Sequence, residues 1–141
     1  MPSRSTTHDL SRIAIAMDTW TRPFWEAADR ERLVVPRCGR CGHYRWPPGP
    51  FCPQCHSQET EWVDPGRGRI YSFTVLSRPP ATEGGEPELS VPTLVRFADA
   101  GGTLLLGSLA DAPIAAIAID APVTIGWAQA ANTRVPIFHL A

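Results

Sequence analysis

Hydrophobic and polar residues alternate in short runs along the second half of this chain. The clearest run extends from Gly68 to Ser77, where positions 70, 72 and 74 oppose positions 71, 73 and 75. A period of two residues is typical of a β-strand with two different faces. Shorter runs of the same kind predict four further strands, at residues 93–97, 103–107, 123–128 and 135–139.

The connections between these runs predict the topology. Residues 99–102 read Asp-Ala-Gly-Gly and favour a hairpin turn. Residues 114–117 favour one turn of helix between the strands at 103–107 and 123–128, the third and fourth of the five, after a capping Asp-Ala-Pro. Residues 78–90 are too long for a simple hairpin turn and are expected to form a loop. Five strands with a short helix that plugs one end predict an OB-fold barrel over residues 66–141.

The N-terminal segment, residues 1–32, has a different pattern. Residues 1–12 are polar and are expected to form a loosely held tail. A helix is predicted from Thr21 to about Arg32, with Thr21 as its cap and Glu26 near the positive end of its dipole. Its buried side is expected to carry Phe24, Trp25 and Ala28.

Between these parts lie the four cysteines of the chain, in two CxxC pairs separated by ten residues. One CxxC turn presents two thiolates to a single ion, and two such turns complete a tetrahedral shell with no open position. This spacing predicts a structural zinc ribbon over residues 33–65, although iron could use the same ligands. Two redox pairs or buried free thiols are the alternatives. Either His43 or His56 could replace a cysteine, but four thiolates suffice. The predicted ligands are Cys38, Cys41, Cys52 and Cys55.

Composition narrows the possible functions. Hydrophobic residues make up 43% of the chain, and 15 prolines and 11 glycines favour short strands with turns over a helical bundle. The net charge is -1, so a nonspecific grip on a polyanion such as DNA is not expected. Residues 112–131 are largely apolar, but two prolines, an aspartate and a glycine interrupt them and exclude a membrane span. A cytoplasmic protein is expected, where paired cysteines more often bind metal than form disulfides.

The residues around the cysteines resemble a known family. The matching runs are Pro23–Ala28, Trp46-Pro47-Pro48 between the two CxxC turns, Glu61–Val63 and Gly66–Thr74. In this order they resemble the family long labelled domain of unknown function 35, over about residues 20–141. Asp120 stands where that family commonly has glycine, and the acidic loop 82–88 matches no family pattern.

The resemblance implies a mainly β protein with an N-terminal helix, a rubredoxin-like zinc ribbon and a five-stranded OB-fold barrel. It also implies an accessory role in acyl-CoA metabolism. Members of the family are usually partners of thiolase-fold enzymes, in acyl transfer, carbon–carbon bond formation or retro-aldol cleavage of CoA thioesters. They typically help to form the CoA or acyl channel and do not supply the nucleophile.

No catalytic set is visible in the sequence. The cysteines are committed to metal, and no serine lies in a GxSxG elbow. Residues that could bind CoA are easier to identify than catalytic ones. A CoA site needs arginines for the phosphates and apolar or aromatic walls for the adenine ring and the pantetheine arm. The candidates are Arg78 beside the long loop and Tyr71, Phe73 and Trp127 on the strands. Tyr71 and Phe73 are expected to share a face, so that at least one is barrel core.

Two other functions remain open at this point. Zinc ribbons and OB barrels also bind single-stranded nucleic acid, although lysine clusters and a basic groove are lacking here. The chain could also be a purely structural bridge between enzymes. Three large rings around the helix, Trp20, Phe24 and Trp25, exceed what a ribbon and a small barrel are expected to bury, and they predict an interface with a partner.

Overall fold

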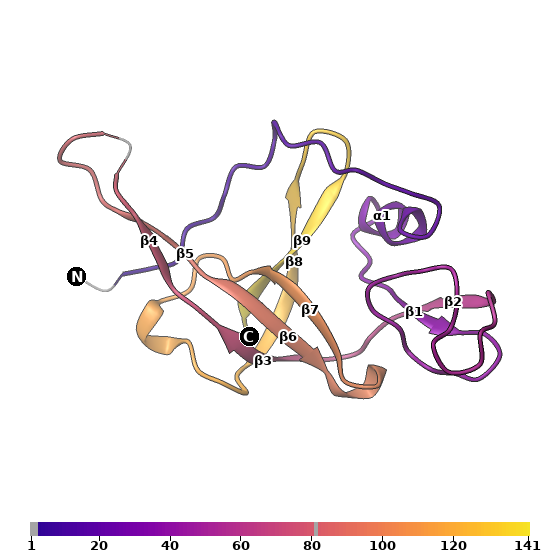
Figure 1. Cartoon of the computed structure of the whole chain (residues 1–141). Coiled ribbons are helices and arrows are strands. Elements are labelled where there is room, and N and C mark those ends of the chain that lie inside the picture. Colours follow the sequence, from indigo (N-terminus) through magenta and orange to yellow (C-terminus); the bar gives the residue numbers. More distant parts are fainter. Residues whose placement is uncertain (1–2, 81) are drawn as a thin grey trace.

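The computed structural model describes residues 3–80 and 82–141 (Figure 1). The protein is mainly β, with one short helix at the ribbon end, as predicted. The ribbon sheet pairs β1 with β2, a second sheet has five strands, and a two-stranded arm projects from it. The elements are α1 (Arg22–Ala28), β1 (Val35–Cys38), β2 (Thr60–Val63), β3 (Gly68–Phe73), β4 (Leu76–Arg78), β5 (Glu88–Ser90), β6 (Pro92–Phe97), β7 (Thr103–Ser108), β8 (Pro122–Gln129), β9 (Arg134–Leu140) and the 3₁₀ turns Ala98–Ala100 and Ile114–Ala116.

The five-stranded sheet curls into the barrel that the sequence predicts. Its order is β7-β6-β3-β8-β9, with antiparallel neighbours throughout. The two end strands approach each other just beyond β7, where Leu109 forms a parallel bridge with Phe138. The N–H of Ala110 donates to the carbonyl oxygen of Phe138 at 2.8 Å. Gly107 allows this approach, because a Cβ atom there would lie 2.6 Å from the Phe138 ring.

One hydrophobic core joins the helix, the ribbon and the barrel. Phe97 and Phe138 are fully buried in the barrel, and the same cluster includes Phe24 of α1 and Val35 of β1. Trp25 and Trp46 pack against it while remaining half-buried. Phe24 and Ala28 lie on the buried side of α1, as predicted, so Phe24 does not contribute to the exposed aromatic surface that the three large rings also suggested. Trp20, in contrast, is 47% exposed.

A bulge in β3 places two aromatic residues, which were expected to share a face, on different faces of the strand. Ile70 pairs with Val95, but the next pairs along β6 are Ser72 with Leu94 and Phe73 with Thr93, so Tyr71 is the extra residue. An extra residue shifts the alternation by one position. Phe73 consequently packs against the core, whereas Tyr71 is 52% exposed. The two side chains do not share a face.

The strand predicted from Gly68 to Ser77 is likewise two strands. β3 ends at Phe73, and β4 leaves the barrel to pair with β5, from Leu76 opposite Ser90 to Arg78 opposite Glu88. Part of the predicted loop 78–90 is therefore one side of a projecting arm (Figure 1). Residue 81 of that loop lies outside the described residues.

From residue 3 onwards, the N-terminal segment is held against the barrel and does not form the loose tail predicted for residues 1–12; residues 1 and 2 lie outside the described residues. Ser5 is buried, and its N–H donates to the carbonyl oxygen of Ala112 at 2.8 Å. The guanidinium of Arg4 pairs with the carboxylate of Asp111 at 2.9 Å. Further along, the side chain of Asn132 bonds both backbone groups of Ile15. The segment consequently crosses the barrel surface as a strap (Figure 1).

The helix is shorter than predicted and is capped differently. Thr21 provides no side-chain cap; instead, the carboxylate of Asp18 accepts the N–H groups of Trp20 and Thr21. The helix ends at Ala28, and Glu31 adopts a left-handed conformation with φ of 57°. A left-handed residue after the last turn is a common helix stop, which explains why the pattern does not continue to Arg32.

Within the described residues, no helix is long and apolar enough to cross a membrane.

Candidate functional site

The four cysteines meet at one point in the ribbon, with all four Sγ atoms within 4.8 Å of one another. Cys38 lies at the end of β1 and the others lie in the two loops that follow. The pair Cys38–Cys55 has its sulfur atoms 3.6 Å apart, and the pair Cys41–Cys52 has them 3.5 Å apart. Each CxxC turn therefore contributes one sulfur to each close pair, so the two turns form a single cluster of four thiols, the ligand set of a structural zinc ion.

Local backbone geometry prepares the Cys38 thiol for a metal. The N–H groups of Arg40 and Cys41 each point at Cys38 Sγ, at 3.4 Å. Chiefly through the Cys41 amide, this arrangement lowers the pKa of the Cys38 thiol from 9.0 to about 6. Both turns close through left-handed residues, Gly42 with φ of 79° and His56 with φ of 62°. Four soft donors with amide support fit a structural zinc ion; the cluster contains no histidine among the described residues.

A buried arginine links the two CxxC turns. Arg45 is 6% exposed, and its guanidinium donates to the hydroxyl of Thr60 and to the carbonyl oxygen of Ser57. The same Ser57 oxygen accepts the N–H of Cys52 at 2.9 Å. Nε of Arg45 has no hydrogen-bond partner within the described part of the chain. A buried cation is costly unless negative charge lies nearby, and four thiolates around a divalent ion carry a net charge of about -2.

The second feature is a cavity of about 360 Å³ between the barrel, α1, the ribbon and the N-terminal strap. Its walls are carbon-rich, and none of the lining side chains is an arginine, aspartate or glutamate. Pockets of this size at the junction of structural units are typical small-molecule sites. The lining residues are Thr7, His8, Leu10, Thr21, Phe24, Trp25, Trp46, Pro47, Pro48, Leu105, Leu106, Gly107, Ser108, Ala110, Ala128, Val135, Pro136 and Ile137.

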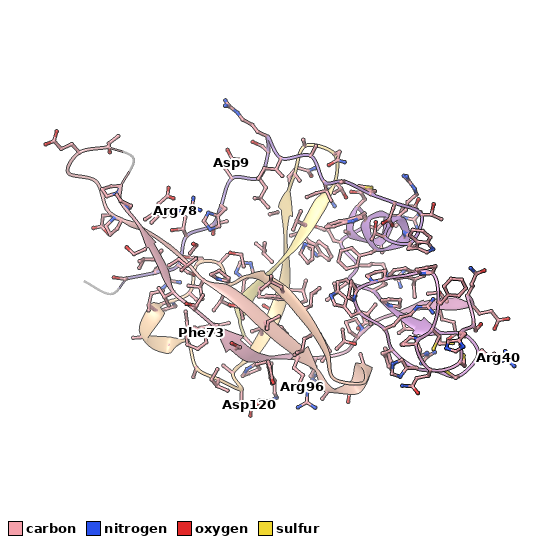
Figure 2. The ribbon with its side chains drawn as sticks, in the orientation of Figure 1. Asp9, Arg40, Phe73, Arg78, Arg96 and Asp120 are labelled. Carbon is pink, nitrogen blue, oxygen red and sulfur yellow. The ribbon has the colours of Figure 1, made fainter. Side chains whose placement is uncertain are left out.

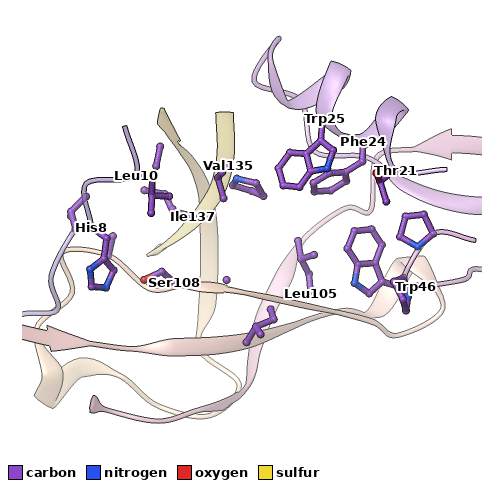
Figure 3. Close-up of a pocket in the computed structure, with 18 residues that line it drawn as sticks. His8, Leu10, Thr21, Phe24, Trp25, Trp46, Leu105, Ser108, Val135 and Ile137 are labelled. Atoms are coloured by element: carbon purple, nitrogen blue, oxygen red, sulfur yellow. The ribbon is translucent and has the colours of Figure 1, made fainter. Parts of the chain in front are cut away.

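The two ends of the cavity differ (Figure 3). Trp25, Phe24 and Trp46 gather at one end, and the ring of Phe24 contacts Trp25 edge-on with centroids 4.8 Å apart. His8 and Ser108 lie at the other end, where the strap passes β7. The cavity is consequently aromatic at the ribbon side and has polar groups at the strap side.

The residues predicted to contact CoA are not brought together by the fold. Arg78 lies exposed on the projecting arm, and Phe73 is the last residue of β3, at the end that leads towards that arm (Figure 2). Tyr71 is exposed at the bulge, and Trp127 packs half-buried against the core. None of the four lines the cavity.

The cavity was not predicted from the sequence. Its walls come from segments that are far apart in the sequence, and the strap was expected to be loose. One signal was available: Trp46-Pro47-Pro48, noted above only as part of the family resemblance, supplies three of the lining residues.

Comparisons with known proteins agree with this architecture. Residues 25–61 match a family model described as the ChsH2 rubredoxin-like zinc ribbon domain, and residues 62–128 match the ChsH2 C-terminal OB-fold domain. A curated relative from Thermomonospora curvata, named probable enoyl-CoA hydratase alpha subunit, is 36% identical over 120 residues. The alignment covers 82% of this chain and 36% of the relative, so the chain spans about a third of that protein's length.

Two solved structures are similar along most of the chain. The structure titled Ltp2-ChsH2(DUF35) aldolase has a TM-score of 0.76 and 32% identity, covering 90% of this chain and 98% of that chain. A DUF35 protein of unknown function from Sulfolobus solfataricus has a TM-score of 0.59 at 14% identity, covering 85% and 84%, and shares the fold. The resemblance seen in the sequence is confirmed: the chain belongs to the ChsH2 family of zinc-ribbon and OB-fold proteins.

Proposed function

We propose that this chain is an accessory subunit without chemistry of its own, which binds or channels a CoA thioester for a partner enzyme. The observation that carries the proposal is the likeness to the Ltp2-ChsH2(DUF35) aldolase, which extends over 98% of that chain at 32% identity. The partner we expect is a thiolase-fold enzyme that performs acyl transfer, carbon–carbon bond formation or retro-aldol cleavage. The relative named as a subunit of an enoyl-CoA hydratase supports the same broad area of acyl-CoA chemistry.

The described residues support an accessory role in two ways. All four cysteines lie in one cluster, which we assign to a structural zinc ion, so no thiol is left as an acyl acceptor. The neutral, carbon-rich cavity could receive part of a thioester but offers no paired acid and base. The role of Arg78 in holding a CoA phosphate remains a proposal; its exposure on the arm would let it act only at a shared surface.

Trp20 is the residue we assign to the partner surface. Its ring is 47% exposed, next to a shallow depression that it lines together with Pro23, Pro36 and Trp62. An exposed tryptophan beside such a depression is a frequent anchor of protein interfaces.

Co-expression with a thiolase-like protein encoded nearby tests the proposal. A stable complex should form, and thioester turnover should require both chains. Trp20→Ala should weaken assembly at least tenfold while leaving the metal content intact; Phe51→Ala, which removes an exposed ring from the ribbon, serves as the comparison. Turnover by the purified chain alone would contradict the proposal. So would a monomer that ignores the thiolase and binds single-stranded DNA tightly at physiological salt.

A further inference from the structure

The barrel is closed at one end and open along the rest of the seam between β7 and β9. Within the described residues, backbone pairing across this seam is confined to Leu109 and Ala110 opposite Phe138. β7 and β9 are the two ends of the sheet order, so each leaves one row of backbone groups without a neighbouring strand. The seam therefore contains two sheet edges that face each other.

The direction of these backbone groups follows from two hydrogen bonds. The N–H of Leu109 donates to Val91 beside β6, whereas the N–H of Ala110 donates across the seam to Phe138. Successive residues of a strand direct their backbone groups to opposite sides, and the β6–β7 register is unbroken from Pro92 to Phe97. Leu106 and Ser108 therefore direct their N–H and C=O groups into the seam.

The same alternation applies to β9. The Phe138 carbonyl oxygen faces the seam, and the β8–β9 register is continuous. Pro136, two residues earlier, thus directs its carbonyl oxygen into the seam as well. Proline suits this position, because the N–H that it lacks would have had no ladder partner.

The cavity described above occupies the open part of this seam. Leu106, Ser108 and Pro136 all line it. The strap borders the cavity at one end and α1 borders it at the other, which leaves room for a short, narrow ligand. A strand from a partner protein would have to continue past these ends, where the strap and α1 already lie.

We propose that the seam binds the pantetheine arm of a CoA thioester as if it were an added strand. This inference rests on the proposed function and assigns a place to one part of its ligand. The arm is extended, uncharged and contains two amides, so it can exchange hydrogen bonds with Leu106, Ser108 and Pro136 as a neighbouring strand would. The walls contain no arginine to hold phosphates, so the nucleotide end of CoA lies outside the cavity.

Amide hydrogen exchange on the metal-loaded full chain tests this placement directly. The probe is an S-acyl pantetheine, which has the arm and no nucleotide. Saturation should slow exchange at the N–H groups of Leu106 and Ser108 by about tenfold or more. The N–H groups of Leu105 and Gly107, which point towards β6, should change little. Unchanged exchange at Leu106 and Ser108 under saturation would overturn the inference, and 3′,5′-ADP, which lacks the arm, should leave both amides as they are.

A proline substitution gives a second test. Leu106→Pro removes a seam N–H without removing a β6–β7 hydrogen bond, and Leu106→Ala shortens the same side chain while keeping that N–H. We expect the proline variant to bind S-acyl pantetheine about 2–10 times more weakly than the alanine variant, the usual effect of one net hydrogen bond. Equal affinities would overturn the inference.

A cavity-filling substitution covers the case in which Leu106→Pro does not fold. Ala128→Leu extends a lining side chain into the cavity and should reduce affinity at least tenfold, whereas Ala115→Leu adds the same bulk at an exposed position. An unchanged affinity of Ala128→Leu for S-acyl pantetheine would overturn the placement of the arm in the seam.

Assays with the partner enzyme distinguish a wrong placement of the pantetheine arm from a wrong proposed function. If turnover depends on both chains but the seam variants bind S-acyl pantetheine and support turnover normally, the placement of the arm in the seam is wrong and the accessory role stands. If no complex forms, the proposed function fails, whatever the exchange data show. Protection of Leu106 and Ser108 by the partner alone would assign the seam to a protein strand and overturn the pantetheine assignment.

Discussion

The hydroxyl group of Thr133 donates a 2.7 Å hydrogen bond to the carboxylate of Asp29. Thr133 lies in the turn between β8 and β9 and is 1% exposed, while Asp29 directly follows α1. Asp29 also accepts the backbone N–H of Arg134. These contacts join residues more than 100 positions apart and hold the helix over the aromatic end of the cavity.

Thr133→Val should therefore destabilise the protein by about 1.5–3 kcal/mol, because a partly buried hydrogen bond to a charged group is lost while the side-chain volume is kept. Thr124→Val changes the same residue type at an exposed position of β8 and should have little effect. Denaturant unfolding of both variants measures the difference. Equal stabilities would mean that the Asp29 contact does not hold α1 in place.

Metal removal should unfold the ribbon. We expect close to one equivalent of zinc in the purified protein by elemental analysis. Cys41→Ser should bind metal much more weakly, because binding at a four-thiolate site is coupled to folding. His43→Ala is the matched control, since this side chain lies next to the site but outside the cluster. A full complement of zinc in Cys41→Ser would contradict the four-cysteine assignment.

Arg45→Ala should cost about 2–5 kcal/mol, the range for emptying a buried site in a core. The variant also leaves the hydroxyl of Thr60 and the carbonyl of Ser57 without their donor. Arg40→Ala is the control, because Arg40 is exposed in the same ribbon. When thermal unfolding is measured with zinc in excess, only Arg45→Ala should have a lower midpoint temperature than the unchanged protein. A midpoint equal to that of Arg40→Ala would mean that the buried guanidinium contributes nothing to the ribbon.

Asp18 should add a small acid-sensitive component to stability. Hydrogen bonding from the Thr21 N–H, first among several causes, lowers the pKa of its carboxyl group below the usual 3.8. A lowered native pKa favours the folded state above about pH 4, and that contribution is lost as the pH falls through the native value. Asp18→Asn should consequently reduce stability near pH 7, with the difference from the unchanged protein shrinking below pH 4. A difference that stays constant with pH would contradict this role.

The barrel was predictable because its strands carry their own local signals. The strands near Thr93, Thr103, Val123 and Val135 lie where the sequence predicts them. β6 and the first half of β7 bury alternate positions, as a strand with one face in the core does, whereas β9 buries Pro136, Ile137 and Phe138 in succession. The CxxC spacing likewise predicted that the four sulfurs would gather. Asp120 takes the left-handed conformation with φ of 68°, so the turn survives without glycine.

The rest depends on contacts between distant segments. A one-residue bulge at Tyr71 cannot be read from alternation alone, and it places Tyr71 and Phe73 on different faces of the strand. The N-terminal strap looks like a tail because its hydrogen bonds go to Leu89 and Ala112, far along the chain. The cavity needs all of these pieces at once, so no single stretch of sequence indicates it.

Because one core joins the ribbon and the barrel, zinc binding at the ribbon should affect binding in the cavity. Trp46 belongs to the ribbon and also forms the aromatic end of the cavity. If the cavity holds the thioester as we propose, metal binding and thioester binding depend on the same folded segment, and two ligands that favour the same state strengthen each other's binding by the same factor. A protein that is short of zinc should lose its grip on the thioester before its barrel unfolds, and a bound thioester should slow the loss of zinc to a chelator.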